Sequence, residues 1–297
     1  MLLPKPGHEF CRVLEASPDF ESQYKGDEGM RKGVLVLIVS VAILVFQAGG
    51  AAAASDRPIF YQLTYQTENV TGQILINGFV VTGLRPTSGN GAAALNLWLI
   101  GENELKAELE KADPSKPAQF QFGVSEMKQG DVVSTMDKGT RFSLELKDKD
   151  FAATSKAQAA KKFKSVLDFK SHLRDAEQVK EGDVLAYAQK FFSMFARKDA
   201  EAILRESEIK ISDYSKAFGG ADMKTELRSY LTDELFKSKL NKVNPKALRA
   251  VPVGPTKSIW HVFNGNDELI KAQSPDGSTM ELPVYIGQYQ GKLQVVR

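Results

Sequence analysis

The residue best suited to acid–base chemistry is a histidine near the end of the sequence. His261 lies in the run Ile259–Phe263, which predicts a strand with Trp260 and Val262 on the opposite face. An imidazole beside a carboxylate can act as a general base, with Asp213 or Asp267 as its partner. The side chains that we expect to shape a pocket around it are Trp260, Tyr214, Tyr285 and Phe192. The alternative is a histidine hydrogen-bonded at a sheet edge, because the spacing fixes no second catalytic group.

Other catalytic patterns are missing from the sequence. It contains no G-x-S-x-G elbow, no P-loop, no dinucleotide-binding glycine motif and no H-E-x-x-H metal motif. His172 falls in a polar stretch, where we expect it to be exposed. The only cysteine is Cys11, so the chain can form no internal disulfide. We therefore expect no metal and no cofactor, and these patterns favour a protein without catalytic activity over an enzyme.

The stretch at residues 30–54 predicts export from the cytoplasm. Arg31 and Lys32 precede a charge-free apolar run, Val34–Phe46, and small residues follow it. Ala52-x-Ala54 before Ser55 fits a signal-peptidase site, and this order of features is typical of a secretory signal peptide. The rest of the chain would then be periplasmic or secreted.

Two questions about this stretch stay open. Residues 33–54 carry no charge and are long enough to cross a bilayer, so the alternative is a retained single-pass anchor in the inner membrane. In both cases residues 55–297 face out, and this segment is the only predicted membrane contact. Residues 1–29 precede the signal and show no periodicity, so we interpret them as disordered or as a misassigned start, with Met30 the true start.

Residues 55–297 carry 34 basic and 31 acidic side chains, a net charge of +3. This near balance gives no reason to expect nucleic acid as a partner. A disulfide-free exported chain of this length fits a bacterial envelope protein. The partner that we expect is an unknown protein or glycan of the envelope.

Residues 56–150 show short alternating stretches separated by turns, which predicts an antiparallel β-sandwich. The expected strands are 59–64, 73–81, 95–100, 105–109, 120–124 and 142–146. Two turn signatures, Ile76-Asn77-Gly78 and Gly101-Glu102-Asn103-x-Leu105, resemble the galactose-binding-like jelly roll attached to many glycoside hydrolases. The resemblance implies that fold and, more distantly, glycan binding. Trp98 could stack on a sugar, or it packs against the core or a neighbouring domain.

Residues 151–182 are rich in Ala, Lys, Gln and Glu, which predicts a helical connector. Within it, Lys156, Lys161, Lys162 and Lys164 form a basic cluster. Such a cluster can contact anionic lipid or an acidic partner, or it is simply a solvated face.

Residues 183–297 predict helices followed by a curled antiparallel sheet, an α+β layout. The expected helices are 184–196, one that follows an N-cap at Asp199, and 223–240. The expected strands are 258–263, 268–274, 280–289 and 292–297. One short run resembles the first helices of the nuclear-transport-factor-2-like cone, the fold of ketosteroid isomerase and related cyclases: Phe192-x-x-Phe195-Ala196-x-x-Asp199-Ala200-Glu201-Ala202. The catalytic residues of the isomerases have no motif match in this sequence.

These observations favour a non-catalytic extracytoplasmic protein that binds a ligand or another protein. An isomerase- or cyclase-like enzyme with His261 in a pocket of the cone is the second hypothesis. Glycan binding by the sandwich is the third. Because one fold can carry many functions, the sites must decide between them.

Overall fold

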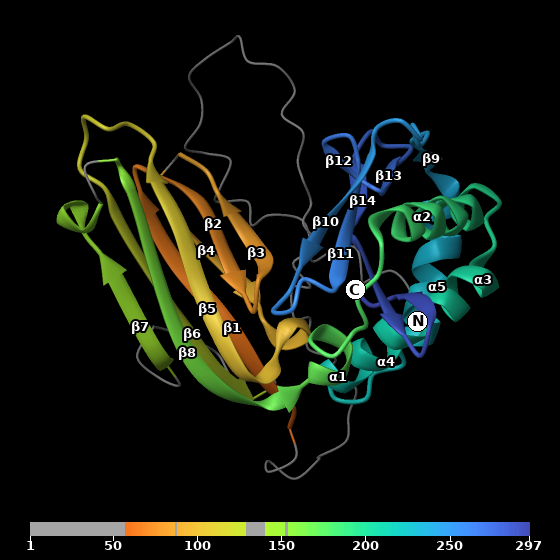
Figure 1. The fold of residues 1–297 in the computed structure, drawn as a ribbon, viewed down its shortest axis with the longest axis horizontal. Helices are drawn as coiled ribbons and strands as arrows, with labels where there is room; N and C mark the ends of the chain where they lie inside the picture. Colours follow the sequence, from red (N-terminus) through yellow and green to blue (C-terminus); the bar gives the residue numbers. More distant parts are fainter. Residues whose placement is uncertain (1–56, 87, 129–139, 152–153) are drawn as a thin grey trace, which may run out of the picture.

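The computed structural model describes residues 57–86, 88–128, 140–151 and 154–297 (Figure 1). This part of the chain forms antiparallel sheets and five α-helices, so the predicted α+β class is confirmed. Residues 1–29 and the predicted export segment 30–54 lie outside the described residues. Within the described ranges, no helix combines the length and the apolar character that a membrane span needs.

The first half, residues 57–168, consists of two four-stranded antiparallel sheets. One has the strand order β4-β1-β6-β7 and the other the order β3-β2-β5-β8. The strands of this half are β1 (Ile59–Glu68), β2 (Val70–Ile76), β3 (Phe79–Leu84), β4 (Gly89–Ala94), β5 (Ile100–Lys111), β6 (Gln119–Lys128), β7 (Thr140–Leu146) and β8 (Lys156–Asp168).

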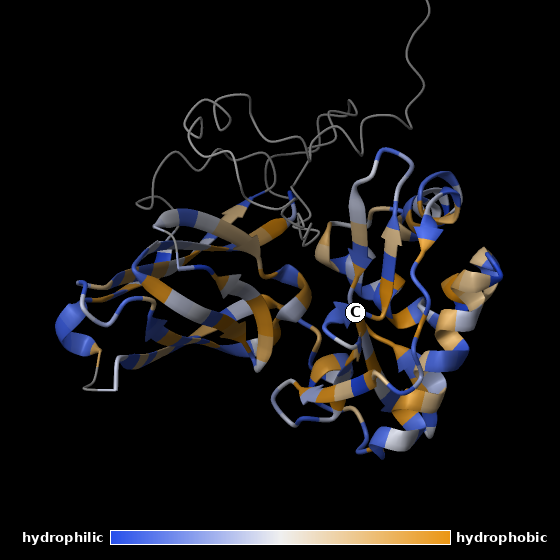
Figure 2. Ribbon diagram, turned by 90° about the horizontal axis from the view of Figure 1, so that it is seen from above, coloured by the Kyte–Doolittle hydropathy of each residue, from blue (hydrophilic) through white to orange (hydrophobic). Residues whose placement is uncertain are grey.

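Alternation along these strands places one set of side chains in a core that both sheets share. Leu63 and Phe120 of the first sheet and Ile74 and Leu105 of the second are fully buried in the same cluster. The neighbours of Leu63, Phe120 and Leu105 along each strand are polar or charged, which contributes to the alternating colours of Figure 2. Burial of large side chains in this way stabilises a chain by about 1.5–3 kcal/mol each.

Turn chemistry decides where two of these strands end. Asn77 and Gly78 have positive φ values of 52° and 81°, and they form the two-residue turn between β2 and β3. Asn-Gly favours this turn because both residues tolerate the left-handed region. The predicted single strand 73–81 is therefore wrong, since it is the two arms of a hairpin.

The predicted strand 95–100 is also wrong. Asn96–Trp98 forms a short 3₁₀ helix before β5 begins. The Asn96 side chain causes this break, because its Oδ1 accepts the N–H of Tyr61 at 2.7 Å and its Nδ2 donates to the carbonyl of Ile59 at 3.0 Å. A buried amide with these partners replaces ladder hydrogen bonds that a strand would make.

The helical connector predicted at 151–182 is wrong over most of its length, because Lys156–Asp168 is the long strand β8. Ala157, Ala159, Phe163 and Leu167 pack toward the core, and the residues at the even positions between them face out. Ala, Lys and Gln favour helices in isolation, but the packing of β8 against β5 overrides that preference. Only α1 (Lys170–Leu173) is helical in the rest of this stretch.

The second half, residues 170–297, contains the helices and two further antiparallel sheets. The larger sheet has the order β10-β11-β15-β16, with β12 also paired to β11, and the smaller has the order β14-β13-β9. The elements after α1 are α2 (Glu181–Ala196), α3 (Ala200–Glu206), α4 (Glu208–Ala217), α5 (Met223–Asp233), β9 (Lys239–Leu240), β10 (Leu248–Val253), β11 (Ile259–Asn264), β12 (Asp267–Glu268), β13 (Ile270–Gln273), β14 (Thr279–Leu282), β15 (Val284–Tyr289) and β16 (Lys292–Val295).

Helix α2 packs on one face of the larger sheet. Val184 and Ala188 of α2 are fully buried in a cluster that also contains Val262 of β11 and Ile286 of β15. Figure 1 shows α2, α3 and α5 on the side of this half that is turned away from the first half. The Asp199 side chain accepts the N–H of Ala202 at 3.0 Å, so the predicted N-cap of α3 is confirmed.

Three predictions for this half need correction. The helix predicted at 223–240 stops at Asp233, and Leu235–Lys237 is a 3₁₀ turn that leads into β9. Helix α4 was not predicted, although it carries Asp213 and Tyr214. Strand β10 was not predicted because prolines surround its end, but it is an edge strand, where Pro252 removes no needed donor.

A third apolar cluster joins the two halves. It contains Phe79 of β3, Phe169, Tyr285 of β15 and Val296, all buried. The backbones also meet directly, because the N–H of Gly254 donates to the carbonyl of Gly78 at 3.3 Å. A Cβ on Gly78 would lie 2.8 Å from the Gly254 carbonyl oxygen, so only glycine permits this approach.

Candidate functional site

His261 is part of a stack of rings on the sheet face opposite α2. Its Nε2 lies 2.8 Å from Oε2 of Glu268, which reaches the same face because β12 turns back along β11. The ring stacks on Tyr285, with 4.2 Å between ring centroids, and lies 4.0 Å from the Phe263 ring. Only 14% of the His261 side chain is exposed to solvent. Two aromatic rings pack against it, and the Glu268 carboxylate pairs with its Nε2.

The carboxylate partner of His261 is therefore Glu268, and the expected partners are wrong. Asp267 is bonded instead to Lys271, whose Nζ lies 2.7 Å from Oδ1. Asp213 lies on α4, where it pairs with other residues. Adjacent positions in β12 point to opposite faces, so only Glu268 can follow His261 across the strand pair.

The residues expected to form one pocket divide between the two faces of the sheet. Tyr285 lies beside His261, but Trp260 and Phe192 pack on the other face, against the core under α2. Tyr214 comes from α4 and packs edge-on to Phe218, 6.1 Å away. Burial raises the pKa of both tyrosines, so both stay neutral phenols at physiological pH.

Asp213 belongs to a buried ionic contact at the junction of the halves. Arg297 donates from Nη1 to Oδ2 of Asp213 at 2.6 Å and from Nε to the carbonyl of Leu97 at 2.8 Å. His172 was expected to be exposed, but it is half-buried, with Nδ1 2.9 Å from Oδ1 of Asp213. These contacts join α4 and the last residues of the chain to the 3₁₀ turn of the first half.

One lysine near these groups has an altered acidity. Lys210 on α4 is half-buried, and its Nζ lies 5.7 Å from the centre of the Tyr214 ring. Burial, and next the positive charge of Arg297, lower the pKa of Lys210 to about 8. A larger share of this amine is neutral near pH 8 than for an ordinary lysine, which increases its value as a base or nucleophile.

Trp98 packs between the two halves. Its ring lies 4.9 Å from Phe79 and 5.2 Å from Tyr285, centroid to centroid. The guanidinium of Arg297 lies 6.0 Å from the same ring. The alternative that Trp98 packs against a neighbouring domain agrees with these contacts, and a role in sugar stacking stays a prediction.

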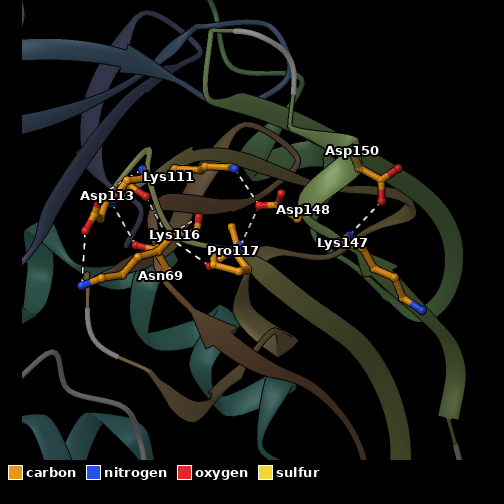
Figure 3. A network of polar contacts seen from close by, with 10 residues as sticks. Asn69, Lys111, Asp113, Lys116, Pro117, Lys147, Asp148 and Asp150 are labelled. Carbon is orange, nitrogen blue, oxygen red and sulfur yellow. Dashed lines mark hydrogen bonds and ion pairs between the residues drawn. The ribbon is translucent and has the colours of Figure 1, made fainter.

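A different polar site lies among the loops that join β1 to β2, β5 to β6 and β7 to β8 (Figure 3). Asn69, in the turn between β1 and β2, organises it. The Asn69 Nδ2 lies within hydrogen-bond distance of three carbonyl oxygens, those of Asp113 at 2.9 Å and of Lys116 and Pro117 at 3.1 Å. Its Oδ1 accepts the N–H of Asp113 at 2.8 Å. One side chain therefore holds the loop between β5 and β6 in a fixed shape.

Asp148, just after β7, connects a second loop to the same place. Its Oδ1 accepts from Lys111 Nζ at 2.6 Å and from the N–H of Ala118 at 2.9 Å. The bond from Lys111 and then the bond from Ala118 hold the pKa of Asp148 below its usual value. About half of the Asp148 side chain, 52%, is still exposed, so lone pairs on its carboxylate remain accessible.

These loops surround a surface hollow of about 320 Å³. Its lining exposes polar and apolar surface in about equal parts and comes from three separate stretches of the chain: Glu68; Pro117, Ala118 and Gln119; and Glu145, Lys147 and Asp148. Gln119 Nε2 donates to Oε1 of Glu145 at 3.1 Å, and Lys147 Nζ lies 3.4 Å from Oε2 of Glu145. The hollow thus offers several carboxylate and amide oxygens whose charge is partly balanced.

The sequence contained only weak signals for this site. Asp113-Pro114-Ser115 has the composition of a turn, but nothing in its spacing indicates that Asn69 holds it. Asn69 has a positive φ of 52°. Asparagine tolerates this conformation better than most residues, so an Asn between two strands was the one available signal.

The hollow and the His261 stack offer different chemistry. The hollow presents hydrogen-bond acceptors and one cation to a ligand from solvent, whereas His261, Glu268 and Lys210 could exchange protons. No group of three or more possible metal-ligating side chains occurs within the described ranges. Comparison with known protein families, curated proteins and solved structures gives no match for this chain. The two fold resemblances therefore stay predictions.

Proposed function

We propose that the chain is a non-catalytic binding protein of the bacterial envelope, exported by residues 30–54, with its ligand site in the hollow. The observation that carries the proposal is the preorganised loop geometry around the hollow. Asn69 and Asp148 fix the two loops that form it before any ligand arrives, which lowers the entropy cost of binding.

The lining suits a small hydroxyl-rich ligand, a glycan of one or two rings. Ligand sites in proteins measure about 300–1,000 Å³, and the hollow lies at the low end of this range. Sugar hydroxyls can donate to Glu68, Glu145 and Asp148, and they can accept from Lys147. The ring of Pro117 gives an apolar surface for the C–H face of a sugar. The proposal keeps the β-sandwich as the fold of the first half and the cone as that of the second.

The test is calorimetric titration of the purified protein, expressed as the full chain, with a panel of neutral and acidic oligosaccharides. We expect Gln119→Ala to weaken the best ligand tenfold or more. Gln121→Ala is the matched control, because it removes the same side chain two residues along β6, outside the hollow lining. Equal effects of the two changes, or no binding with a Kd below about 1 mM, would refute the site.

Export needs its own measurement. Residues 1–56 joined to a reporter that is active only outside the cytoplasm should give activity, and replacing Arg31 and Lys32 by Glu should reduce it. N-terminal sequencing of the exported product separates cleavage before Ser55 from a retained anchor. An inactive fusion would contradict the export proposal but would leave the ligand site untouched.

A second candidate is an acid–base enzyme, in which His261 paired with Glu268 takes a proton and Lys210 or Tyr285 assists. The 2.8 Å contact between His261 and Glu268 favours it. It requires a substrate to reach a histidine that is packed between rings. A screen of keto–enol isomerisations should show turnover that His261→Ala abolishes and that Trp98→Phe retains, and turnover equal in both variants would exclude it.

A further inference from the structure

Strand β8 forms one edge of its sheet. Among the described residues, its only ladder partner is β5, with pairs from Ile100 opposite Asp168 to Glu110 opposite Lys156. The C-terminal end of the strand is not available for pairing, because the N–H of Val166 already donates to Tyr61 Oη at 3.0 Å. The open part of the edge is therefore Lys156–Lys164. Alternate backbone N–H and C=O groups of an edge strand point away from the sheet, where another strand can bind them.

Opposite charges face each other across the pair of strands β5 and β8. On the outer face, Lys156, Lys162 and Lys164 of β8 lie opposite three glutamates of β5: Glu110, Glu104 and Glu102. Lys164 Nζ lies 3.4 Å from Oε1 of Glu102. Three of the four lysines of the basic cluster, all but Lys161, therefore lie on the outer face along the open edge and form the lysine column. The glutamates of β5 form the glutamate column one strand behind it, and Lys106 interrupts that column.

We propose that this edge binds an extended acidic peptide segment of a partner protein as an added strand. A strand beside β8 would lie about 4.8 Å from the lysine column and twice as far from the glutamate column. Opposite charges directly across a strand pair stabilise it, and like charges destabilise it. The added strand therefore carries Glu or Asp at the outward positions that face Lys156, Lys162 and Lys164, whereas the positions that face Gln158 and Ala160 need no charge.

The same geometry argues against a second copy of this chain as the occupant. Two β8 strands side by side would place lysines opposite lysines in most registers. Lysines on an edge strand can also serve only to prevent such self-association. This protective role predicts aggregation on loss of the lysines but predicts no peptide binding, so the two roles can be separated.

The test uses the purified full chain and a fluorescent nine-residue peptide with Glu at every second position and Thr or Val between. Fluorescence anisotropy is measured in 50 mM and 500 mM salt. We expect saturable binding that weakens tenfold or more at the higher salt. The triple change Lys156→Glu, Lys162→Glu and Lys164→Glu should abolish binding. The control triple Lys224→Glu, Lys246→Glu and Lys292→Glu changes the net charge equally on exposed residues of the second half, and it should bind like wild type.

Backbone pairing has a separate readout. N-methylation of every second residue removes the hydrogen bonds of one peptide edge only. The affinity of one methylated series should fall tenfold or more, and the series shifted by one residue should bind like the unmethylated peptide. The proposal is overturned if wild type does not bind at low salt, if both lysine triples behave alike, if both methylated series bind equally, or if replacing the three β8 lysines with Thr causes aggregation while wild type binds no peptide.

Discussion

Replacement of Asn69 should loosen the loop beside the hollow by a predictable amount. Asn69→Gly keeps the left-handed backbone but removes the amide that faces Asp113, Lys116 and Pro117. The carbonyls of Lys116 and Pro117 are exposed and can bind water instead, so only the two bonds to the half-buried Asp113 backbone are lost in full. At about 0.5–1.5 kcal/mol each, the free energy of unfolding should fall by about 1–3 kcal/mol.

Asn69→Ala should cost about 1–2 kcal/mol more than Asn69→Gly. The φ of 52° is in the left-handed region, which a residue with a Cβ pays to enter. Urea unfolding measures both losses, and amide hydrogen exchange at Asp113 reports the loop directly, because its N–H donates to Asn69. Ligand affinity at the hollow should fall in both variants.

Asn77 provides the matched control at the other end of the same half. It has the same φ of 52°, its Nδ2 donates to the carbonyl of Trp98 at 2.7 Å, and its Oδ1 accepts the N–H of Glu104 at 2.9 Å. Asn77→Gly should also destabilise the protein, but ligand affinity should not change. An Asn69→Gly protein with normal unfolding and slow exchange at Asp113 would refute the reasoning.

Three further changes have expected outcomes. Arg297→Met leaves Asp213 buried without its cation and should lower the free energy of unfolding by about 3–5 kcal/mol, and adding Asp213→Asn should recover part of that loss in urea titrations. Lys210→Met should stabilise the protein at pH 7, because the folded state holds a half-buried cation whose pKa is about 8 instead of the ordinary 10.5. Since the unfolded chain binds more protons between these values, the stability of wild type relative to Lys210→Met should rise from pH 8 to 10.5, and a flat difference would contradict this cause. Glu268→Gln should leave oligosaccharide affinity unchanged in calorimetry, because Glu268 lies on the His261 face and not in the hollow.

Much of the first half followed from local patterns. Period-two alternation and turn residues located four of the six expected strands approximately, those at 59–64, 105–109, 120–124 and 142–146, since a strand buried on one face must alternate. The same rule failed at residues 156–168, where Ala and Lys at both inward and outward positions hide the alternation. Lys161 faces the same way as Phe163, so one charged residue broke the pattern that the strand otherwise follows. The backbone pairing with β5 and the burial of Ala157 against the core explain why this segment is extended.

The candidate sites were harder to predict than the strands. The partner of His261 depends on the residue at which the chain turns back from β11 into β12. If the register is shifted by one residue, Asp267 takes the place of Glu268 on the sheet face that carries His261. The hollow depends on three stretches of chain that are far apart in the sequence. Asn69 reaches residues 44 to 48 positions away, and no local pattern encodes such distances.

The junction determines which surfaces a partner can reach. At the junction, Trp98 and Phe79 of the first half pack against each other, and Arg297 of the second half lies over the Trp98 ring. These contacts occupy the end of the first half that faces the second half. A ligand at that end would have to separate groups whose loss costs several kcal/mol, such as the pair of Arg297 and Asp213. The loops around Asn69 and the open edge of β8 carry no such cost, because the described contacts of the junction do not involve them. For this reason we place both proposed interactions on the first half, away from the second, and treat the tightly packed chemistry around His261 as the less accessible alternative.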